Sequence, residues 1–421
     1  MKRFLLDGDI APSNARAGIS PREPAAARQS SLREHNLALA SQTIFSSATP
    51  LSRARLAEET GMTRSTVSRL AEDLLRAGLV VEQDVKAAGR PGRPAVPLAP
   101  ARGTVAGLGL QVNVDYMAGR VIDLAGDVVA EAHIDGDFES SDPHQVLAEA
   151  GRLTRRLCAR ATATGARVAG ACLGLPGLVD VRGGRLLLAP NLAWHEIVPR
   201  ELMGPDALPP GVDLAVENDA NLAAYGIAHP APGRVAKRDT FLYVAGDIGV
   251  GAAMVTKGRV VDGQHGWAGE IGHVSIEPDG PQCHCGARGC LERYAGKHAV
   301  LEAAALRPGA LVTDLAAAAS SGYGAARAAV ERAAWALGLA LAGTVNIIDV
   351  DDVVLGGGFI PLVELMRPGI EEQLRLRTLA GPWSHVTLRA APDDPAPAAT
   401  GGALRALEPV IRNPAAWIPG P

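Results

Sequence analysis

Aromatic side chains are scarce in this chain of 421 residues, where Phe, Trp and Tyr together make up only 4%. Hydrophobic residues nevertheless reach 47%, so the cores must be built mainly from Ala, Val and Leu. No apolar run approaches the roughly 20 residues that a membrane-spanning helix needs. The apolar start from Met1 to Leu6 resembles a signal peptide, but Asp7 and Asp9 end it. We therefore expect a cytoplasmic protein of two or three domains without a membrane partner.

Cysteine is also rare, and the total of five excludes a disulfide-rich secreted scaffold. Three of the five, Cys283, Cys285 and Cys290, nevertheless fall within eight positions, and His273 lies ten residues before the first of them. Three thiolates and one imidazole form the closed four-ligand shell that is typical of a structural zinc ion. The sequence therefore predicts a structural Zn²⁺ held by these four residues.

Two alternatives stay open for this cluster. Buried cysteines or a disulfide would have the same composition, although nothing else in the chain suggests an oxidising compartment. His284 lies between two of the cysteines and would be a second choice for the imidazole ligand. The remaining cysteines, Cys158 and Cys172, have apolar neighbours and are predicted to be core thiols.

The net charge of −4 conceals an asymmetry along the chain. Residues 1–97 contain 14 Lys and Arg against 10 Asp and Glu, which gives +4 and leaves −8 for the remainder. A mildly basic N-terminal part on an acidic body indicates that the basic part contacts an anion. Residues 1–30 show no periodicity, and we expect them to be disordered.

Residues 31–98 have the pattern of a winged helix-turn-helix. Apolar residues at helical spacing mark the first and third helices: Leu32, Leu39 and Phe45, then Val67, Leu70 and Leu74. Ser52 and Thr63 precede the second and third helices as N-caps, and Gly61 supplies the turn between them. A strand begins near Leu79, and residues 89–94 read as the tip of a wing.

The start of the third helix and the wing carry residue types that contact bases and phosphates. These candidate DNA contacts are Arg64, Ser65, Thr66, Ser68, Arg69, Arg90 and Arg93. A helix-turn-helix pattern alone also fits an ordinary helical hairpin, and a Gly-Arg-Pro repeat alone also fits a linker. Their order and the basic charge together favour binding to double-stranded operator DNA.

The rest of the chain predicts two α/β lobes. Strands are expected at 104–110, 116–123, 128–133 and 168–173, and again at 240–244, 252–256, 259–261 and 353–355. Helices are expected at 143–163 and 325–348. Because a triplet of strands recurs beside helices, we expect two related lobes with a cleft between them, where ligands commonly bind.

Three motifs in this part resemble the ROK family of repressors and sugar kinases. They are Glu-Asn-Asp-Ala-Asn at 217–221, Gly-Glu-Ile-Gly-His at 269–273, and Cys-x-Cys-Gly-x-x-Gly-Cys-Leu-Glu at 283–292. The resemblance covers about residues 104–410. It implies a two-lobed actin- or hexokinase-like (ribonuclease-H-like) α/β domain, and the winged helix-turn-helix is similar to that of the family's repressor branch.

The resemblance also implies a sugar site in the cleft. The residues that match the family's contacts with a hexose-type sugar are Asn191, Asn218, Asp219, Glu270, His273 and Glu292. In the family's kinases the position of Asp219 holds the catalytic base. His273 would ligate zinc through one ring nitrogen and present the other to the sugar. Amide and carboxylate groups suit this role because they make directional, bidentate hydrogen bonds.

The phosphate loops of the family's kinases are altered in this chain. The first, at 111–115, reads Gln-Val-Asn-Val-Asp and lacks the glycines that let backbone N–H groups approach phosphates. The second, at 246–249, carries Asp247, whose carboxylate would repel a nucleotide. We therefore expect no sugar kinase activity.

These observations predict a sugar-responsive transcriptional regulator, a repressor of carbohydrate-utilisation genes that a sugar releases from its operator. A single recognition helix gains affinity by pairing on a palindromic site, so a homodimer or homotetramer is expected. The alternatives are an ATP-dependent sugar kinase with a regulatory head, and a regulator controlled by a protein partner.

Overall fold

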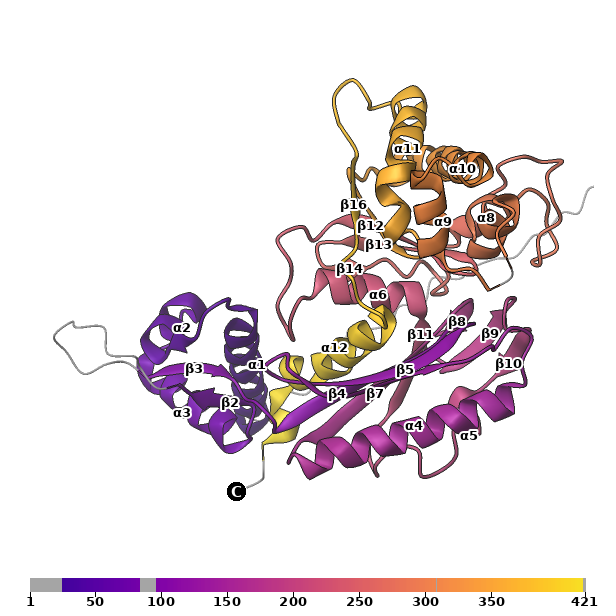
Figure 1. Cartoon of the computed structure of the whole chain (residues 1–421). Coiled ribbons are helices and arrows are strands. Elements are labelled where there is room, and N and C mark those ends of the chain that lie inside the picture. The colour runs from indigo at the N-terminus through magenta and orange to yellow at the C-terminus, as the bar shows by residue number, and fades with distance from the viewer. Residues whose placement is uncertain (1–24, 84–95, 308, 419–421) are drawn as a thin grey trace, which may run out of the picture.

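The computed structural model describes residues 25–83, 96–307 and 309–418, which form a small N-terminal head and two α/β lobes (Figure 1). The head consists of α1 (Ala25–Ser46), β1 (Leu51–Ser52), α2 (Arg53–Thr60), α3 (Arg64–Arg76), β2 (Val80–Glu82) and β3 (Pro97–Pro100). The three strands form one sheet in the order β1-β3-β2. Helix α1 begins at Ala25, so residues 25–30, which we expected to be disordered, are helical.

Both predicted helix caps in the head are confirmed. The Ser52 side chain accepts a hydrogen bond from the backbone N–H of Arg55 at 3.2 Å. The Thr63 side chain accepts one from the N–H of Thr66 at 3.2 Å, and Gly61 between the two helices has φ of +70°.

The inner face of α3 is as predicted, and that of α1 only in part. Val67, Leu70 and Leu74 are fully buried. Phe45 is buried as predicted, but Leu32 and Leu39 are 59% and 37% exposed. The buried residues of α1 are Leu37, Ala40, Ser41, Ile44 and Phe45, which have the spacing of one helix face, and Leu32 and Leu39 lie on the opposite face. The buried face packs on the head core and on helix α12 (Pro397–Arg412).

The first lobe has a five-stranded sheet in the order β11-β7-β4-β5-β6, with β8, β9 and β10 in a separate small sheet. Its elements are β4 (Val105–Val112), β5 (Tyr116–Asp123), β6 (Val128–Asp135), α4 (Pro143–Ala163), β7 (Arg167–Leu175), β8 (Leu178–Asp180), β9 (Arg185–Ala189), β10 (Trp194–Ile197), α5 (Pro199–Leu202), β11 (Leu214–Asn218), α6 (Asp219–Ala228) and α12 (Pro397–Arg412).

The second lobe has a sheet in the order β14-β13-β12-β15-β16. Its elements are β12 (Phe241–Gly246), β13 (Val250–Thr256), β14 (Arg259–Val260), η1 (Ile271–His273), α7 (Glu292–Ala295), α8 (Lys297–Ala303), α9 (Val312–Ser320), α10 (Gly324–Ile348), β15 (Asp352–Gly357), η2 (Ile360–Leu362), α11 (Val363–Arg377) and β16 (Thr387–Ala390). The last element of the described residues, η3 (Pro414–Trp417), packs against the head core.

The two sheets share one topology, which confirms the predicted two-lobed fold. In each, an antiparallel triplet (β4-β5-β6 and β12-β13-β14) extends through two parallel strands beside its first strand (β7 and β11, β15 and β16). Helix α4 covers the outer face of the first sheet, while α12 and α6 lie between the two sheets (Figure 1). Helices α10 and α11 cover the outer face of the second sheet.

Helix α10 is long and apolar enough, by length and composition, to cross a membrane. This corrects the expectation that the chain contains no such segment. Its apolar window is 61% buried within the protein, against α7, α8, α9 and α11 of the second lobe. Burial of this kind is what a core helix shows.

Helix α12 lies unusually close to its neighbours because glycines face it and lie within it. A Cβ atom added at Gly109 of β4 would overlap the carbonyl oxygen of Ala399, and one added at Gly401 would overlap the carbonyl oxygen of Leu222 in α6. The helix therefore packs backbone against backbone on both sides, which fixes it to the first lobe.

Replacement of Gly401 by Ala should lower the free energy of unfolding by about 1–3 kcal/mol, because the added methyl group must displace backbone. Chemical denaturation measures this change. Gly343→Ala is the matched control: Gly343 is exposed within α10 and nothing lies near its Cβ position, so alanine there should stabilise by about 0.5–1 kcal/mol. Equal stability of the two variants would contradict the close packing of α12.

Candidate functional site

A cleft of about 240 Å³ lies between the lobes, at the carboxyl ends of several strands. Asn113 follows β4, Gly177 follows β7, Asp219 follows β11 and Asp247 follows β12, and all four residues line the cleft. Ligands of open α/β sheets commonly bind at this edge. All six residues that the family resemblance assigned to sugar binding line the same cleft: Asn191, Asn218, Asp219, Glu270, His273 and Glu292.

Asp219 starts helix α6 at the floor of the cleft. Its Oδ1 accepts a hydrogen bond from the backbone N–H of Ala220 at 2.9 Å. Burial and then the neighbouring carboxylate of Asp247 raise the pKa of Asp219 to about 7. The group therefore changes its charge near neutral pH, and it is placed to accept or donate a hydrogen bond to a ligand.

Asn218 is held by the protein itself. Its Nδ2 donates to the carbonyl oxygen of Gly177 at 3.0 Å, and its Oδ1 accepts from the backbone N–H of Asn221 at 3.2 Å as the cap of α6. One amide hydrogen remains for a ligand. The Asn218 side chain thus caps helix α6 and at the same time holds one N–H donor in a fixed position in the cleft.

The wall contributed by the second lobe carries two carboxylates. Glu270 lies just before the short helix η1, and burial raises its pKa. A Cβ atom added at Gly249 would lie against Oε2 of Glu292 and Nδ2 of Asn191. The side chains of Glu292 and Asn191, which come from opposite lobes, therefore both lie against Gly249. A larger residue at position 249 would collide with them.

Sequence reasoning missed two polar contacts that join the lobes across the cleft. Nδ2 of Asn113 donates to Oδ2 of Asp247 at 3.0 Å, and Nζ of Lys297 donates to Oδ2 of Asp115 at 2.6 Å. Three of these residues belong to the segments 111–115 and 246–249, which the sequence analysis compared with kinase phosphate loops, and Lys297 begins α8. Each pair is more than 130 positions apart, so no local pattern could have revealed it.

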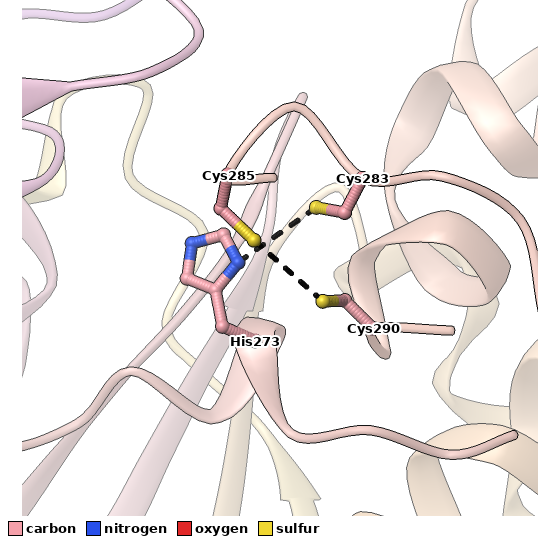
Figure 2. Close-up of side chains that lie close together, drawn as sticks. All are labelled: His273, Cys283, Cys285 and Cys290. Atoms are coloured by element: carbon pink, nitrogen blue, oxygen red, sulfur yellow. Dashed lines mark hydrogen bonds between the residues drawn. The ribbon is translucent and has the colours of Figure 1, made fainter. Parts of the chain in front are cut away.

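The predicted metal ligands come together at one edge of the cleft (Figure 2). Nδ1 of His273 lies 3.9 Å from Sγ of Cys283, Sγ of Cys285 lies 3.7 Å from Sγ of Cys290, and all four ligand atoms lie within 4.8 Å of one another. A tetrahedral zinc with Zn–S of ~2.3 Å and Zn–N of ~2.0 Å needs S···S edges of about 3.8 Å and S···N edges of about 3.6 Å. The four side chains therefore fit a tetrahedral metal ion.

The alternatives for this cluster do not match the structure. All five cysteines are free, and the 3.7 Å between Cys285 and Cys290 far exceeds the S–S bond length of about 2.05 Å. His284 is exposed and is not part of the ligand group. Cys158 and Cys172 are buried in the first lobe, as expected.

His273 joins this cluster to the cleft. Its Nδ1 faces the thiols, while its Nε2 lies 3.9 Å from Oε2 of Glu270 on the cleft side. A metal bound through Nδ1 would fix the ring and leave Nε2 protonated as a hydrogen-bond donor. The geometry thus allows the two roles that the sequence analysis assigned to one side chain.

The predicted DNA-reading residues lie at the start of α3 in the head. Arg64, Ser65 and Arg69 are exposed, and Thr66 and Ser68 are half-buried. The hydroxyls of Ser65 and Thr66 also contact the Thr63 cap, at 3.0 Å and 2.9 Å. The two wing arginines, Arg90 and Arg93, lie outside the described residues.

Comparison with known proteins agrees with this arrangement. A model described as the ROK family matches residues 107–407. The chain belongs to the ROK family. A second model, described as the MarR family, matches residues 46–91, and this winged-helix match confirms the predicted type of head.

Relatives of this ROK chain include both regulators and kinases. The xylose repressor of Bacillus spizizenii is 31% identical over 255 residues, which cover 60% of this chain and 64% of that repressor. The glucokinase of Thermotoga maritima is 32% identical over 221 residues, 48% of this chain and 68% of the kinase. A solved ROK family transcriptional regulator, described as a homologue of the E. coli MLC protein, has a TM-score of 0.73 at 25% identity and covers 92% of this chain and 99% of its own.

Replacement of Asp219 by Asn should stabilise the ligand-free protein at pH 8 by about 1–3 kcal/mol. The folded state raises the pKa of Asp219 from 3.8 to about 7, so folding favours the protonated form and stability falls as the pH rises between these values. The gain in melting temperature should therefore shrink as the pH falls from 8 to 5.

Asp213→Asn provides the control, because Asp213 is exposed in the loop before β11. Its melting temperature should follow that of the wild type at every pH. If the difference in melting temperature between Asp219→Asn and the wild type stayed constant from pH 5 to pH 8, folding would not raise the pKa of Asp219.

Proposed function

We propose that this protein is a sugar-responsive transcriptional repressor that leaves its operator when a hexose-type sugar binds between the lobes. The observation that carries the proposal is the convergence of six amide, carboxylate and imidazole side chains on one interlobe cleft in a chain whose head is a winged helix-turn-helix. Asn191, Asn218 and Asp219 would bind the sugar from the first lobe, and Glu270, His273 and Glu292 from the second.

Helix α12 supplies a route from the cleft to the head. At its start, Pro397 lines the cleft and the N–H of Ala398 donates to Oε1 of Gln111 at 3.1 Å. At its end, Leu407, Val410 and Ile411 are buried in the core of the head. The helix thus contacts the cleft at one end and the head core at the other, so a displacement of its first turn would also displace the head.

The segment before α12 crosses from the second lobe to the first. It leaves β16 at Ala390 and is held by Arg120 of β5, whose Nη1 donates to both carboxylate oxygens of Asp394 at 2.9 Å and 3.0 Å. Closure of the lobes around a sugar would pull on this segment and move the first lobe, α12 and the head as one unit relative to the second lobe. A ligand changes the head only as far as it prefers one lobe arrangement over the other.

We assign Zn²⁺ as the metal of the His273, Cys283, Cys285 and Cys290 cluster. Three soft thiolates and one imidazole in tetrahedral spacing favour zinc over hard cations. All four positions of the shell are filled by protein, so the ion would have a structural role. It would fix the loop from 273 to 290 and the ring of His273 in the cleft wall.

The kinase alternative has one specific observation in its favour. A carboxyl group with a pKa of about 7, such as that of Asp219, suits a general base for a sugar hydroxyl. Against it, the family resemblance expects phosphate at segments 111–115 and 246–249, and there Asn113 donates a hydrogen bond to the carboxylate of Asp247, which would repel phosphate. We therefore propose a binding role for Asp219 and no useful phosphoryl transfer.

The proposal further includes a cytoplasmic homodimer or homotetramer on double-stranded operator DNA. Each head presents one recognition helix, α3, and two heads on a palindromic site would provide the affinity that one helix lacks. The DNA contacts would come from Arg64, Ser65, Thr66, Ser68 and Arg69, together with the wing arginines Arg90 and Arg93.

The zinc assignment predicts about one zinc per chain in the purified protein, measured by elemental analysis. Cys283→Ser should lose most of the metal and lower the melting temperature, because three ligands hold the ion more weakly than four. Cys158→Ser, which removes a buried thiol far from the cluster, should keep the full zinc content. A Cys283→Ser protein that retained all its zinc would contradict the ligand set.

The effector assignment predicts that a monosaccharide weakens binding to promoter DNA, measured by fluorescence anisotropy with a panel of hexoses, pentoses and their phosphates. Asp219→Asn should bind the same DNA with wild-type affinity but need roughly tenfold more sugar for release, because loss of a charged hydrogen bond costs about 1–3 kcal/mol. By linkage, DNA should weaken sugar binding by the factor by which sugar weakens DNA binding.

The double variant Arg64→Ala, Arg69→Ala separates the two sites. It should bind sugar normally, lose most DNA affinity and show a flatter salt dependence, because fewer phosphate contacts release fewer counterions.

Release of the wild-type protein from DNA by a partner protein, with no response to any sugar, would support the partner alternative. Asp219-dependent sugar phosphorylation with Mg-ATP would support the kinase alternative.

A further inference from the structure

A second cavity, of about 410 Å³, lies beside the sugar cleft. It is lined by the β8–β9 hairpin on one side and by the loop 262–267 on the other. The two cavities are lined by different residues of the same two segments. Leu188 lines the cleft and the preceding Leu187 lines the second cavity, while Gly269 lines the cleft and Trp267, two residues earlier, lines the second cavity.

The loop that forms the outer wall is anchored. The backbone N–H of Ala252 in β13 donates to the carbonyl oxygen of Gly269 at 3.0 Å, and the N–H of Ala268 donates to that of Asp262 at 3.3 Å. A Cβ atom added at Gly266 would lie 3.5 Å from the carbonyl oxygen of Val179, an ordinary van der Waals contact with β8. The loop is thus tied to β13 and lies against β8.

The wall of this cavity presents an aromatic pair in a chain that is poor in aromatics. The rings of His265 and Trp267 lie 4.8 Å apart and are tilted by 31°. Trp267 is 40% exposed. Charged and amide side chains line the same cavity: Asp180, Arg182, Asp262 and Gln264.

We propose that the second cavity binds a second ring of the effector, so that the natural ligand is a disaccharide or a glycoside with a cyclic aglycone. The inference rests on the proposed sugar site and deepens it. The C–H groups on a pyranose face carry partial positive charge and suit the negative face of the indole of Trp267. The surrounding carboxylates, guanidinium and amide would bind hydroxyl groups of the same ring.

The arrangement favours a ligand ring over a docked protein. The aromatic pair lines a concave cavity with polar groups around it, which is the usual composition of a small-molecule site.

Calorimetry on the full-length, zinc-loaded protein tests the proposal. The probes are D-glucose and D-xylose, their α- and β-linked 4-nitrophenyl glycosides, and cellobiose, maltose and xylobiose. At least one two-ring ligand should bind tenfold or more tightly than its parent monosaccharide. Trp267→Ala should abolish this advantage while changing the Kd for the monosaccharide less than twofold.

Trp383→Ala is the matched control, because Trp383 is 85% exposed and lines neither cavity. It should bind every probe as the wild type does. Two-ring ligands that bind no tighter than monosaccharides, or an advantage that survives Trp267→Ala, would overturn the second-ring site and leave the proposed function intact. If the wild type bound neither monosaccharides nor two-ring ligands, the proposed function itself would fail, and the second-ring site with it.

Discussion

The direct contact of helix α12 with β4 and α6 is the constraint on which the rest of the structure depends. Gly109 and Gly401 remove the side chains that would separate these backbones. Small residues at such contacts explain why a chain with so few aromatics still builds tight cores. Because α12 is fixed to the first lobe at one end and lies in the head core at the other, the head follows the first lobe rather than moving freely.

The cleft gathers carboxylates that a stable fold would avoid. Burial raises the pKa of Asp219, Asp247 and Glu270, and the first two also repel each other. The hydrogen bond from Asn113 to Asp247 offsets part of this cost and at the same time joins the two lobes. A ligand whose hydroxyl groups donate hydrogen bonds to these carboxylates would stabilise the folded protein, so the site suits such a ligand.

Features that depend on local sequence were predictable, and features that depend on distant contacts were not. The bounds of α4 were predicted without error, because residues 143–163 keep a helical period. The four candidate metal ligands could be grouped from the sequence because they lie within eighteen positions. Helix α12 was missed, since Gly401 and Gly402 lower its helix propensity and only packing stabilises it. The pairing of Lys297 with Asp115 and the place of Trp267 depend on loops that meet only in the folded chain.

The division of the site between the lobes decides whether ligand binding can act on the head. Asn191, Asn218 and Asp219 belong to the first lobe, while Glu270 and His273 belong to the second. A ligand that touched one lobe alone would bind open and closed arrangements equally and would shift nothing, however tightly it bound. A ligand that touches both prefers the arrangement in which both walls reach it. A metal ion bound by the cluster would add to this difference, because it would hold the His273 ring in place and the whole lobe would have to move for the ring to reach a ligand.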